Sequence, residues 1–513
     1  MIILRLDRKA SKPLHKQVFD QLRHMIDRHV LTAGTRLPST RALAERHGLS
    51  RTTVLRAYEE LWGQGYLESR PGSYTTVRAK TPCCTPAVTE RESLIDWSAA
   101  ISPAGREMYG TMSNFPPSGY HETSWEMLDM ASLDIDHRIL PVDDFKRCLT
   151  KVVVEDTDIF NYGSSKGDPG LREAISERLK VHGIFCEPDG ILITNGSQQS
   201  LDLITRFFVR PGSTIVTESP TYMHAMPLMR FYGAQLSCVE MNASGMALNA
   251  LESVLEESTP EFIYTIPNFQ NPTGITMCQS VREQLLSIAE RHRVPIVEDA
   301  FEEEMKYFGK VPMPVKSMDA KGVVIYMSSF SKVLFPGIRT GWIAADKEFI
   351  GRINALKRVT DLTSNSVIQA AMREFIRRGY YDLHIKRMHR IYKRRMSTAV
   401  EALRSWLPSG RVSWDEPSGG YLIWLRLKGL RATEQELHRE LEKHGVTVSK
   451  GAQYFPKTPR DHHMRLSISK LDEKEIEEAV ARLCKALRKL YRRREGIKGG
   501  RSRRARKRKA EKG

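Results

Sequence analysis

The sequence lacks any segment suited to crossing a membrane. No apolar run in the 513 residues reaches the roughly 18 that a transmembrane helix needs. The first residues also lack the apolar core of a secretory signal peptide. We therefore expect a cytoplasmic protein, long enough to bury several hydrophobic cores.

Cysteine is scarce, and its spacing does not suit a structural role. The seven cysteines are an odd number, and their spacing matches no metal site. Cys83 and Cys84 are adjacent in a stretch that contains several prolines. We expect reduced thiols and no metal, as in an intracellular protein.

Acidic residues are outnumbered at the two ends of the chain. Residues 1–80 carry 15 Lys and Arg against 7 Asp and Glu, and residues 491–513 carry 12 against 2. Because the net charge of the whole chain is +18, these ends leave residues 81–490 neutral. The ends are therefore the parts that favour nucleic acid. The last segment lacks apolar periodicity and is expected to be disordered, adding nonspecific DNA affinity or serving only solubility or RNA attraction.

From about residue 170 to 350, runs rich in Val, Ile and Tyr alternate with helical periodicity. The predicted strands cover residues 191–194, 214–217, 262–266, 294–297 and 323–327, with helical segments such as 279–292 between them. This alternation predicts an α/β fold with a largely parallel sheet covered by helices on both faces. In such sheets, ligands bind beyond the carboxyl ends of the strands.

The residues that follow these strands suit pyridoxal phosphate. The cofactor is an aldehyde, so it needs a lysine for its internal Schiff base and a carboxylate that keeps its pyridine nitrogen protonated. Lys332 and Asp299 each follow a predicted strand and can fill these roles. Either residue alone would be read as a surface lysine or a helix-cap aspartate. In order with Asn271 and Arg339, they predict a pyridoxal phosphate pocket.

Residues from about 130 to 485 resemble the fold-type I aminotransferases of the aspartate aminotransferase superfamily. The resemblance implies that Lys332 forms the Schiff base, that Asp299 pairs with the pyridine nitrogen and that Asn271 faces the ring hydroxyl. It further implies ring stacking by Tyr222, phosphate binding by Ser197, Gln198, Ser329 and Arg339, and carboxylate binding by Arg465. Tyr162 resembles a tyrosine that reaches the phosphate of the neighbouring subunit. Arg465 could instead be a solvated strand-edge residue, and Tyr162 a packed loop aromatic.

One position departs from this family. A tyrosine usually follows shortly after the aspartate and binds the ring hydroxyl, whereas this chain reads Asp299-Ala300-Phe301. Phenylalanine can pack against the ring but cannot donate a hydrogen bond, which counts against efficient transamination. In a related sensor of γ-aminobutyrate, an arginine two residues past the stacking tyrosine binds the ligand. His224 stands there in this chain and argues against that ligand.

The first 80 residues predict a winged helix-turn-helix. Helical periodicity covers residues 13–30 and 51–64, and a further helix starts near Thr40. Two short strands are expected between residues 66 and 77. The last helix opens with hydrogen-bond donors, as a recognition helix entering the major groove does. A generic three-helix bundle is the plainer alternative.

The segments Leu37 to Ala44 and Ser50 to Val54 resemble the GntR-type regulators. The resemblance implies that the second and third helices and the wing contact double-stranded operator DNA. The expected DNA-binding residues are Arg36, Ser39, Thr40, Arg41, Ser50, Arg51, Thr52, Thr53 and Gly72.

The two halves together resemble the MocR subfamily, in which a GntR-type reader is fused to an aminotransferase-like domain. We expect the reader over residues 1–80, a linker and arm over 81–130, the pyridoxal phosphate domain over 131–490, and the basic tail over 491–513. The resemblance implies a bacterial, homodimeric transcriptional regulator, associated with the nucleoid when it binds DNA. Its large domain would sense an amine, an amino acid or the cofactor itself through the Lys332 Schiff base.

Other functions stay open at this stage. The complete set of Lys332, Asp299, Asn271 and Arg465 is compatible with a working aminotransferase whose DNA binding serves feedback. The fused reader and Phe301 favour the sensor. A helix-turn-helix that serves only dimerisation is hard to reconcile with Arg41, Arg51 and the positive charge of residues 1–80.

Overall fold

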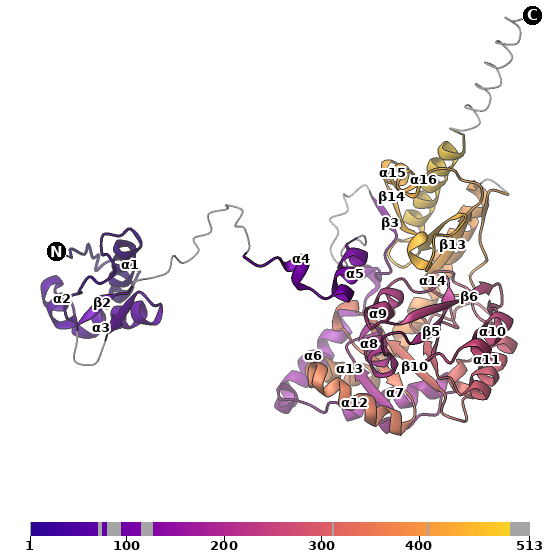
Figure 1. Ribbon diagram of the computed structural model, residues 1–513, viewed down its shortest axis with the longest axis horizontal. Helices are drawn as coiled ribbons and strands as arrows, with labels where there is room; N and C mark the ends of the chain where they lie inside the picture. Colours follow the sequence, from indigo (N-terminus) through magenta and orange to yellow (C-terminus); the bar gives the residue numbers. More distant parts are fainter. Residues whose placement is uncertain are drawn as a thin grey trace, which may run out of the picture. The chain divides into compact units, whose positions relative to one another are not determined.

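The computed structural model describes residues 2–69, 74–78, 94–113, 127–309, 312–407 and 410–492. The chain divides into two compact units, Met1–Asp96 and Trp97–Gly513, which are drawn in Figure 1. Gly72, the two adjacent cysteines and nearly all of the basic tail lie outside the described residues. None of the described helices is long and apolar enough to span a membrane.

The first unit has the predicted winged helix-turn-helix arrangement. It contains α1 (Leu14–Asp27), α2 (Thr40–His47), α3 (Arg51–Gly63) and the antiparallel pair β1 (Leu67–Ser69) and β2 (Thr75–Val77). Apolar residues at helical spacing in α1 and α3 pack into one core. The fully buried members of that core are Val18, Leu22, Leu43, Val54, Ala57 and Leu61.

The second unit is built on an eight-stranded sheet in the order β4-β11-β10-β9-β8-β5-β6-β7. The strands are β4 (Ile191–Thr194), β5 (Thr214–Ser219), β6 (Gln235–Asn242), β7 (Gly245–Met246), β8 (Ile263–Thr265), β9 (Ile296–Asp299), β10 (Val324–Ser329) and β11 (Gly341–Ala344). Only β11 and β7 run antiparallel to their neighbours. The predicted, largely parallel sheet is confirmed, and its strands are apolar because both faces are covered.

Helices surround this sheet and continue into a second lobe (Figure 1). Their bounds are α4 (Trp97–Ala100), α5 (Pro103–Met112), α6 (Val142–Glu155), α7 (Pro169–Val181), α8 (Ser197–Phe208), α9 (Ala225–Phe231), α10 (Leu248–Glu257), α11 (Gln279–His292), α12 (Lys347–Asp361), α13 (Ser366–Arg377), α14 (Tyr380–Trp406), α15 (Glu434–Lys443) and α16 (Glu473–Arg492). Helix α8 packs on β4, β10 and β11, and α5 of the predicted arm contacts α9.

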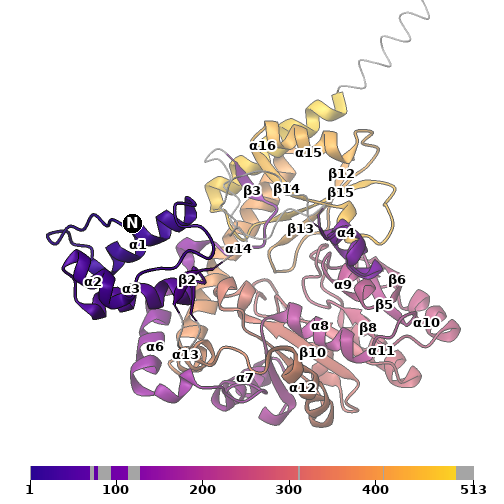
Figure 2. The same cartoon turned by 60° about the vertical axis from the view of Figure 1, so that its left-hand side comes forward.

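The second lobe holds a five-stranded sheet in the order β12-β13-β15-β14-β3, seen with α14 and α16 in Figure 2. Its strands are β3 (Leu128–Met130), β12 (Val412–Ser413), β13 (Leu422–Leu427), β14 (Val446–Lys450) and β15 (His462–Ser467). Strand β3 precedes the large sheet in sequence but pairs with β14 in the small one. Residues 128–130, predicted as part of the arm, are therefore a strand of this lobe.

Candidate functional site

The predicted ligand-binding residues meet at the carboxyl ends of the parallel strands. Asp299 is the last residue of β9, and Lys332 ends the short 3-10 turn Phe330–Lys332 that follows β10. The two strands are parallel neighbours in the sheet. Both side chains therefore reach the same edge, where a ligand can lie across the strand ends.

Asp299 is a buried carboxyl group with one oxygen free. Its side chain is 4% exposed, and the Tyr264 hydroxyl donates to Oδ2 at 2.8 Å. Its Oδ1 atom has no hydrogen-bond partner among the described residues. Burial raises the pKa of Asp299 to about 7, against the hydrogen bond from Tyr264. A cationic ring nitrogen would satisfy the free oxygen and favour the charged carboxylate.

Lys332 is an amine whose charged form is disfavoured. Its Nζ donates to the carbonyl oxygen of Leu133 at 3.2 Å, and its own carbonyl oxygen accepts from the Tyr421 hydroxyl at 2.7 Å. Burial lowers the pKa of Lys332, although the nearby Asp134 opposes this shift. An uncharged amine is the nucleophilic form, so the surroundings of Lys332 suit attack on an aldehyde.

The start of α8 and Arg339 lie together at the predicted phosphate position. Gly196 precedes the helix with φ +90° and provides no side-chain cap, so the first N–H groups of α8 lack a capping side chain. The Arg339 guanidinium fills the space beside Gly196, where a Cβ atom would lie 2.7 Å from Nη2. That Nη2 donates to the Asn195 carbonyl oxygen at 3.1 Å. Helix N–H groups beside a guanidinium favour a phosphate group.

The other residues predicted around the phosphate and ring fall nearby. Ser197 is the first residue of α8, and the Tyr222 hydroxyl donates to Oε1 of Gln198 at 3.2 Å. The Ser329 hydroxyl accepts from the backbone N–H of Ser331 at 2.9 Å and so holds the turn that carries Lys332. Tyr222 is thus hydrogen-bonded to the start of α8, and Ser329 is hydrogen-bonded to the turn Phe330–Lys332.

Arg465 joins the two lobes at this site. It lies in β15, is 4% exposed, and donates from Nη1 to Oδ1 of Asn271 at 3.1 Å and from Nη2 to the carbonyl oxygen of Ala131 at 2.6 Å. Its guanidinium carbon lies 5.3 Å from the centre of the Tyr454 ring. Its Nε has no partner within the described ranges. The plainer expectation of a solvated edge residue is therefore wrong.

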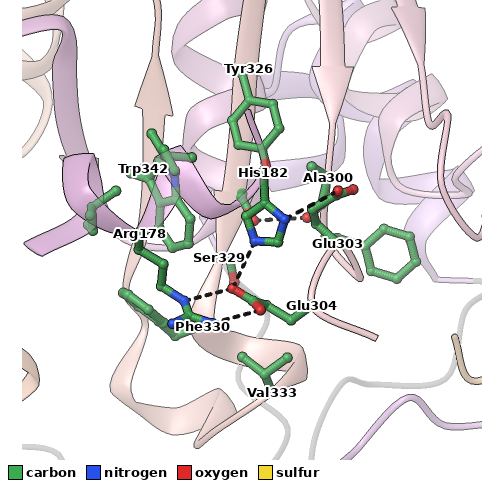
Figure 3. A pocket seen from close by; sticks show the side chains of 14 residues that line it. Arg178, His182, Ala300, Glu303, Glu304, Tyr326, Ser329, Phe330, Val333 and Trp342 are labelled. Carbon is green, nitrogen blue, oxygen red and sulfur yellow. Dashed lines mark hydrogen bonds and ion pairs between the residues drawn. The ribbon is translucent and has the colours of Figure 1, made fainter. Parts of the chain in front are cut away.

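Tyr162 and Phe301 lie apart from this set. Tyr162 is 87% exposed, so its predicted contact with a neighbouring subunit stays a prediction. Phe301 lines a small cavity with His182 and Trp342, shown in Figure 3.

The cavity lies between the end of β10 and α7. Its walls include Tyr326, Ser328 and Ser329 of β10 and Arg178 of α7. An ion pair between Arg178 and Glu304 lies there (Figure 3). Phe301 thus lines a cavity against α7, and its expected packing against the ring stays a prediction.

The site contains residues that sequence reasoning missed. Tyr264 binds Asp299, and Tyr421 binds the backbone carbonyl oxygen of Lys332. Glu302 is fully buried, and the charges of Lys332 and Arg465 lower its pKa. Tyr264 falls inside a predicted strand, where an aromatic residue reads as core. Its place in a strand next to the one that ends at Asp299 was the only available signal.

The residues present fit pyridoxal phosphate. The free oxygen of Asp299 suits a protonated ring nitrogen, and the uncapped start of α8 beside Arg339 suits a phosphate. Lys332 follows β10, which lies between β9 and β11 in the sheet. When bound, the cofactor supplies an aldehyde that condenses reversibly with amines and a ring that withdraws electrons. Among the residues described, no cluster of His, Cys, Asp or Glu side chains could hold a metal ion.

In the first unit, two serines begin the helices expected to meet DNA. The Ser39 hydroxyl accepts from the Ala42 N–H at 3.1 Å, and the Ser50 hydroxyl accepts from the Thr53 N–H at 3.1 Å. These are N-cap bonds, which stabilise α2 and α3. The Ser50 hydroxyl also lies 2.8 Å from the hydroxyls of Thr52 and Thr53. Ser50, predicted to contact DNA, therefore also stabilises the start of α3 through its hydrogen bonds.

The basic residues of this unit are exposed near those helix starts. Arg41 is largely exposed and pairs loosely with Glu45 at 3.3 Å, and Arg51 opens α3 on the surface. Arg36 lies over the Tyr74 ring, 4.6 Å from its centre, which brings it to the edge of the wing. This arrangement matches a recognition helix flanked by phosphate-binding groups.

Comparisons with known proteins agree with both units. Residues 129–483 match the family of class I and II aminotransferases, and residues 14–77 match bacterial regulatory proteins of the gntR family. The chain is 32% identical to a probable rhizopine catabolism regulatory protein, MocR, from Rhizobium meliloti, over 94% of this chain and 96% of that protein. The chain belongs to the MocR-type regulators.

Further matches support this assignment. The MocR-type chain is 30% identical to the HTH-type transcriptional regulator YisV of Bacillus subtilis, over 94% of this chain and 98% of that protein. LysN, the alpha-aminoadipate aminotransferase of Thermus thermophilus solved with N-(5'-phosphopyridoxyl)-L-leucine, matches with a TM-score of 0.71 and 29% identity, over 77% of this chain and 99% of that one. This MocR-type protein is thus a pyridoxal-phosphate-dependent transcriptional regulator with a DNA-binding domain.

Replacing Asp299 tests the ring end of the pocket. We expect Asp299→Asn to weaken pyridoxal phosphate binding by about 1.5–3 kcal/mol, because a charged hydrogen bond to the ring nitrogen is lost. This corresponds to about a 10- to 150-fold higher Kd, measured by fluorescence titration of cofactor-free protein. Tyr264→Phe is the matched control, since it removes only the hydrogen bond to Oδ2. An unchanged Kd for Asp299→Asn would contradict the role of Asp299.

Proposed function

We propose that the large unit is a sensor, in which an amine or amino acid that reacts at the Lys332 site, or pyridoxal phosphate itself, changes the affinity of the first unit for an operator. The observation that carries this proposal is that Lys332 and Asp299 follow neighbouring parallel strands and that the charge of Arg465 acts on Lys332, in a chain that also carries a DNA-binding domain. The roles of the site residues, the four-part domain division and the DNA contacts belong to the same proposal.

The chemistry of the pocket supports an amino acid as the effector class. Its amino group would compete with Lys332 for the aldehyde carbon of the cofactor, while its carboxylate would take a place at Arg465. Arg465 already connects the lobes through Asn271 and Ala131, so a carboxylate that draws it away changes contacts on both sides. A ligand shifts a conformational equilibrium only through such differential contacts.

A homodimer is part of this proposal. Two readers match a repeated or palindromic operator, and the exposed Tyr162 would reach the phosphate bound by a second copy. A cytoplasmic location, with nucleoid association when DNA is bound, accompanies the regulator function.

A working aminotransferase is the second candidate, because the pocket contains an amine, a ring carboxylate and a carboxylate-binding arginine together. In that function Lys332 would move protons and the reader would serve feedback. Steady turnover of an amino donor with a keto acid, combined with DNA affinity that is indifferent to ligand and cofactor, would favour this candidate.

The deciding experiment measures the coupling between ligand and DNA. Holo-protein is titrated with amino acids and simple amines while its visible absorbance is recorded. Each ligand that shifts the spectrum is then tested for its effect on binding to an operator fragment by fluorescence anisotropy. We expect a coupling of about 1–3 kcal/mol, or 5- to 150-fold, and the same factor for the effect of DNA on ligand affinity. Equal DNA affinity with and without every such ligand would contradict the sensor.

Arg465 provides a sharper test of the ligand class. We expect Arg465→Lys to weaken an amino acid that shifts the spectrum by about tenfold or more, because lysine keeps the charge but cannot form two parallel hydrogen bonds. Simple amines and pyridoxal phosphate should bind as before. Arg426→Lys, on the neighbouring strand β13 and paired with Asp461, is the control. Equal losses for amines and amino acids would show that Arg465 does not recognise the carboxylate.

A further inference from the structure

Glu302 is a buried acid to which the proposed cofactor site assigns no role. It lies in the turn after β9 and is fully buried. Its Oε2 accepts from the backbone N–H of Tyr421 at 3.1 Å, whereas Oε1 has no hydrogen-bond partner among the described residues. Gly420 has φ +69°, and a Cβ there would lie 2.5 Å from Oε2. The backbone of the small lobe thus approaches this carboxyl group closely and holds it in place.

Neighbouring acids are engaged in a different way. Both oxygens of Glu298 accept backbone N–H groups, Glu303 binds Asn268 and Lys306, and Glu304 binds Arg178 and His182. Glu302 interacts with positive charge only at longer range, through Lys332 and Arg465. Of the acids in this run, it is therefore the one whose pKa is lowered by the lysine and arginine of the pocket.

The surroundings of Glu302 favour its neutral form. The titratable groups that face it are Lys332, Arg465, Tyr307 and Tyr421. Burial raises the pKa of Glu302 to about 8, and the N–H of Tyr421 and the two cations only partly oppose this shift. A carboxyl group that is neutral near pH 7 has an O–H to donate, and Oε1 is the oxygen available for it.

We infer that Glu302 is an ionisable hydrogen-bond donor in the cofactor pocket. Its O–H would donate to a polar group of pyridoxal phosphate or Lys332, in place of the tyrosine hydroxyl that the aminotransferase family usually has. This inference rests on the proposed attachment of the cofactor to Lys332. Two observations support it: Glu302 has a buried oxygen without a hydrogen-bond partner among the described residues, and Tyr421 binds Glu302 through its N–H and the carbonyl oxygen of Lys332 through its hydroxyl.

The inference makes the charge of the lysine-bound cofactor depend on Glu302. Near neutral pH the neutral acid donates a hydrogen bond. At alkaline pH Glu302 becomes an anion, and a negative charge close to the nitrogen of Lys332 holds a proton on that nitrogen. An opposite charge within about 4–6 Å shifts a pKa by about 1–3 units. Because the two groups interact, the holo-protein should titrate in two overlapping steps and not in one.

The test is a pH titration of the visible absorbance of holo-protein. Glu302→Gln keeps an oxygen for the Tyr421 N–H and an N–H in place of the O–H, but it cannot ionise. We expect its titration to reduce to a single one-proton step whose midpoint lies about one unit or more below that of the wild type. Phe301→Tyr is the control and should titrate as the wild type does, because the inference assigns the donor role to residue 302, whereas residue 301 lines the cavity against α7.

The outcomes separate this inference from the proposed function. Equal titrations for Glu302→Gln and the wild type, or a changed titration for Phe301→Tyr alone, would overturn the inference. If the glutamine variant does not fold, the pH titration of the wild-type holo-protein still tests the inference. A single one-proton transition in that titration would overturn the inference as well. Absence of any borohydride-trapped cofactor on Lys332 in the wild type would instead overturn the proposed attachment itself.

Discussion

Lys332→Ala is expected to abolish covalent attachment of pyridoxal phosphate. Borohydride reduction fixes only a carbon–nitrogen double bond to an amine, and in this pocket Lys332 is the amine whose pKa burial lowers. The variant should lose the visible absorbance and give no cofactor adduct by mass spectrometry of its peptides. Its fold should persist, because the Tyr421 hydroxyl binds the backbone carbonyl of residue 332 and not its side chain. The cofactor should still bind noncovalently, but more weakly.

The same variant should separate the two units functionally. Lys332→Ala should bind an operator fragment, because the reader has its own core, but this binding should no longer respond to amines. Lys347→Ala, which removes an exposed lysine at the start of α12, is the control and should behave as the wild type does. An adduct found on any other lysine, or an amine response that survives in Lys332→Ala, would contradict the assignment.

Local patterns predicted the elements that depend on local sequence. The predicted segments 191–194 and 279–292 are β4 and α11 with the same bounds. By contrast, β9 begins two residues after its predicted start and β10 runs two residues past its predicted end. The end of β10 is determined by pairing of Ser328 and Ser329 with Trp342 and Gly341 of β11. A sequence read locally contains no information about that partner.

The chemistry of single site residues was predictable, whereas their contacts were not. Arg465 and Asn271 are separated by 194 residues, and their hydrogen bond depends on the docking of the small sheet against the large one. Strand β3 has three residues, too few for a periodic signal, so residues 128–130 were predicted as part of the arm. The carbonyl oxygens of Ala131 and Leu133, just beyond β3, nevertheless accept from Arg465 and Lys332.

Glu302 shows why buried charge is hard to predict. The run Glu302-Glu303-Glu304 reads as a solvated surface, since acids are seldom fully buried. Its burial depends on Gly420 and Tyr421 of the small lobe, which lie more than a hundred residues away.

Arg51→Ala is expected to lower operator affinity by about 1–3 kcal/mol, or 5- to 150-fold, if its guanidinium contacts a base edge or a closely bound phosphate. Arg51 is exposed as the first residue of α3, directly after the Ser50 cap, where a recognition helix enters the major groove. Because the cap bond from Thr53 to Ser50 does not involve Arg51, the thermal unfolding of the reader should change little. Fluorescence anisotropy on operator and unrelated DNA would measure the loss of specificity.

Two controls distinguish the reader from the basic tail. Arg28→Ala removes a charge of the same kind at the end of α1, away from the α2–α3 turn in sequence, and should weaken binding to both DNAs slightly and equally. A chain ending at residue 492 loses the charge of the tail, so it should keep its sequence preference while its affinity for unrelated DNA falls and depends less on salt. Loss of operator recognition on truncation, with Arg51→Ala unchanged, would assign recognition to the tail. The opposite pattern would place specificity at the start of α3, where the structure exposes Arg51.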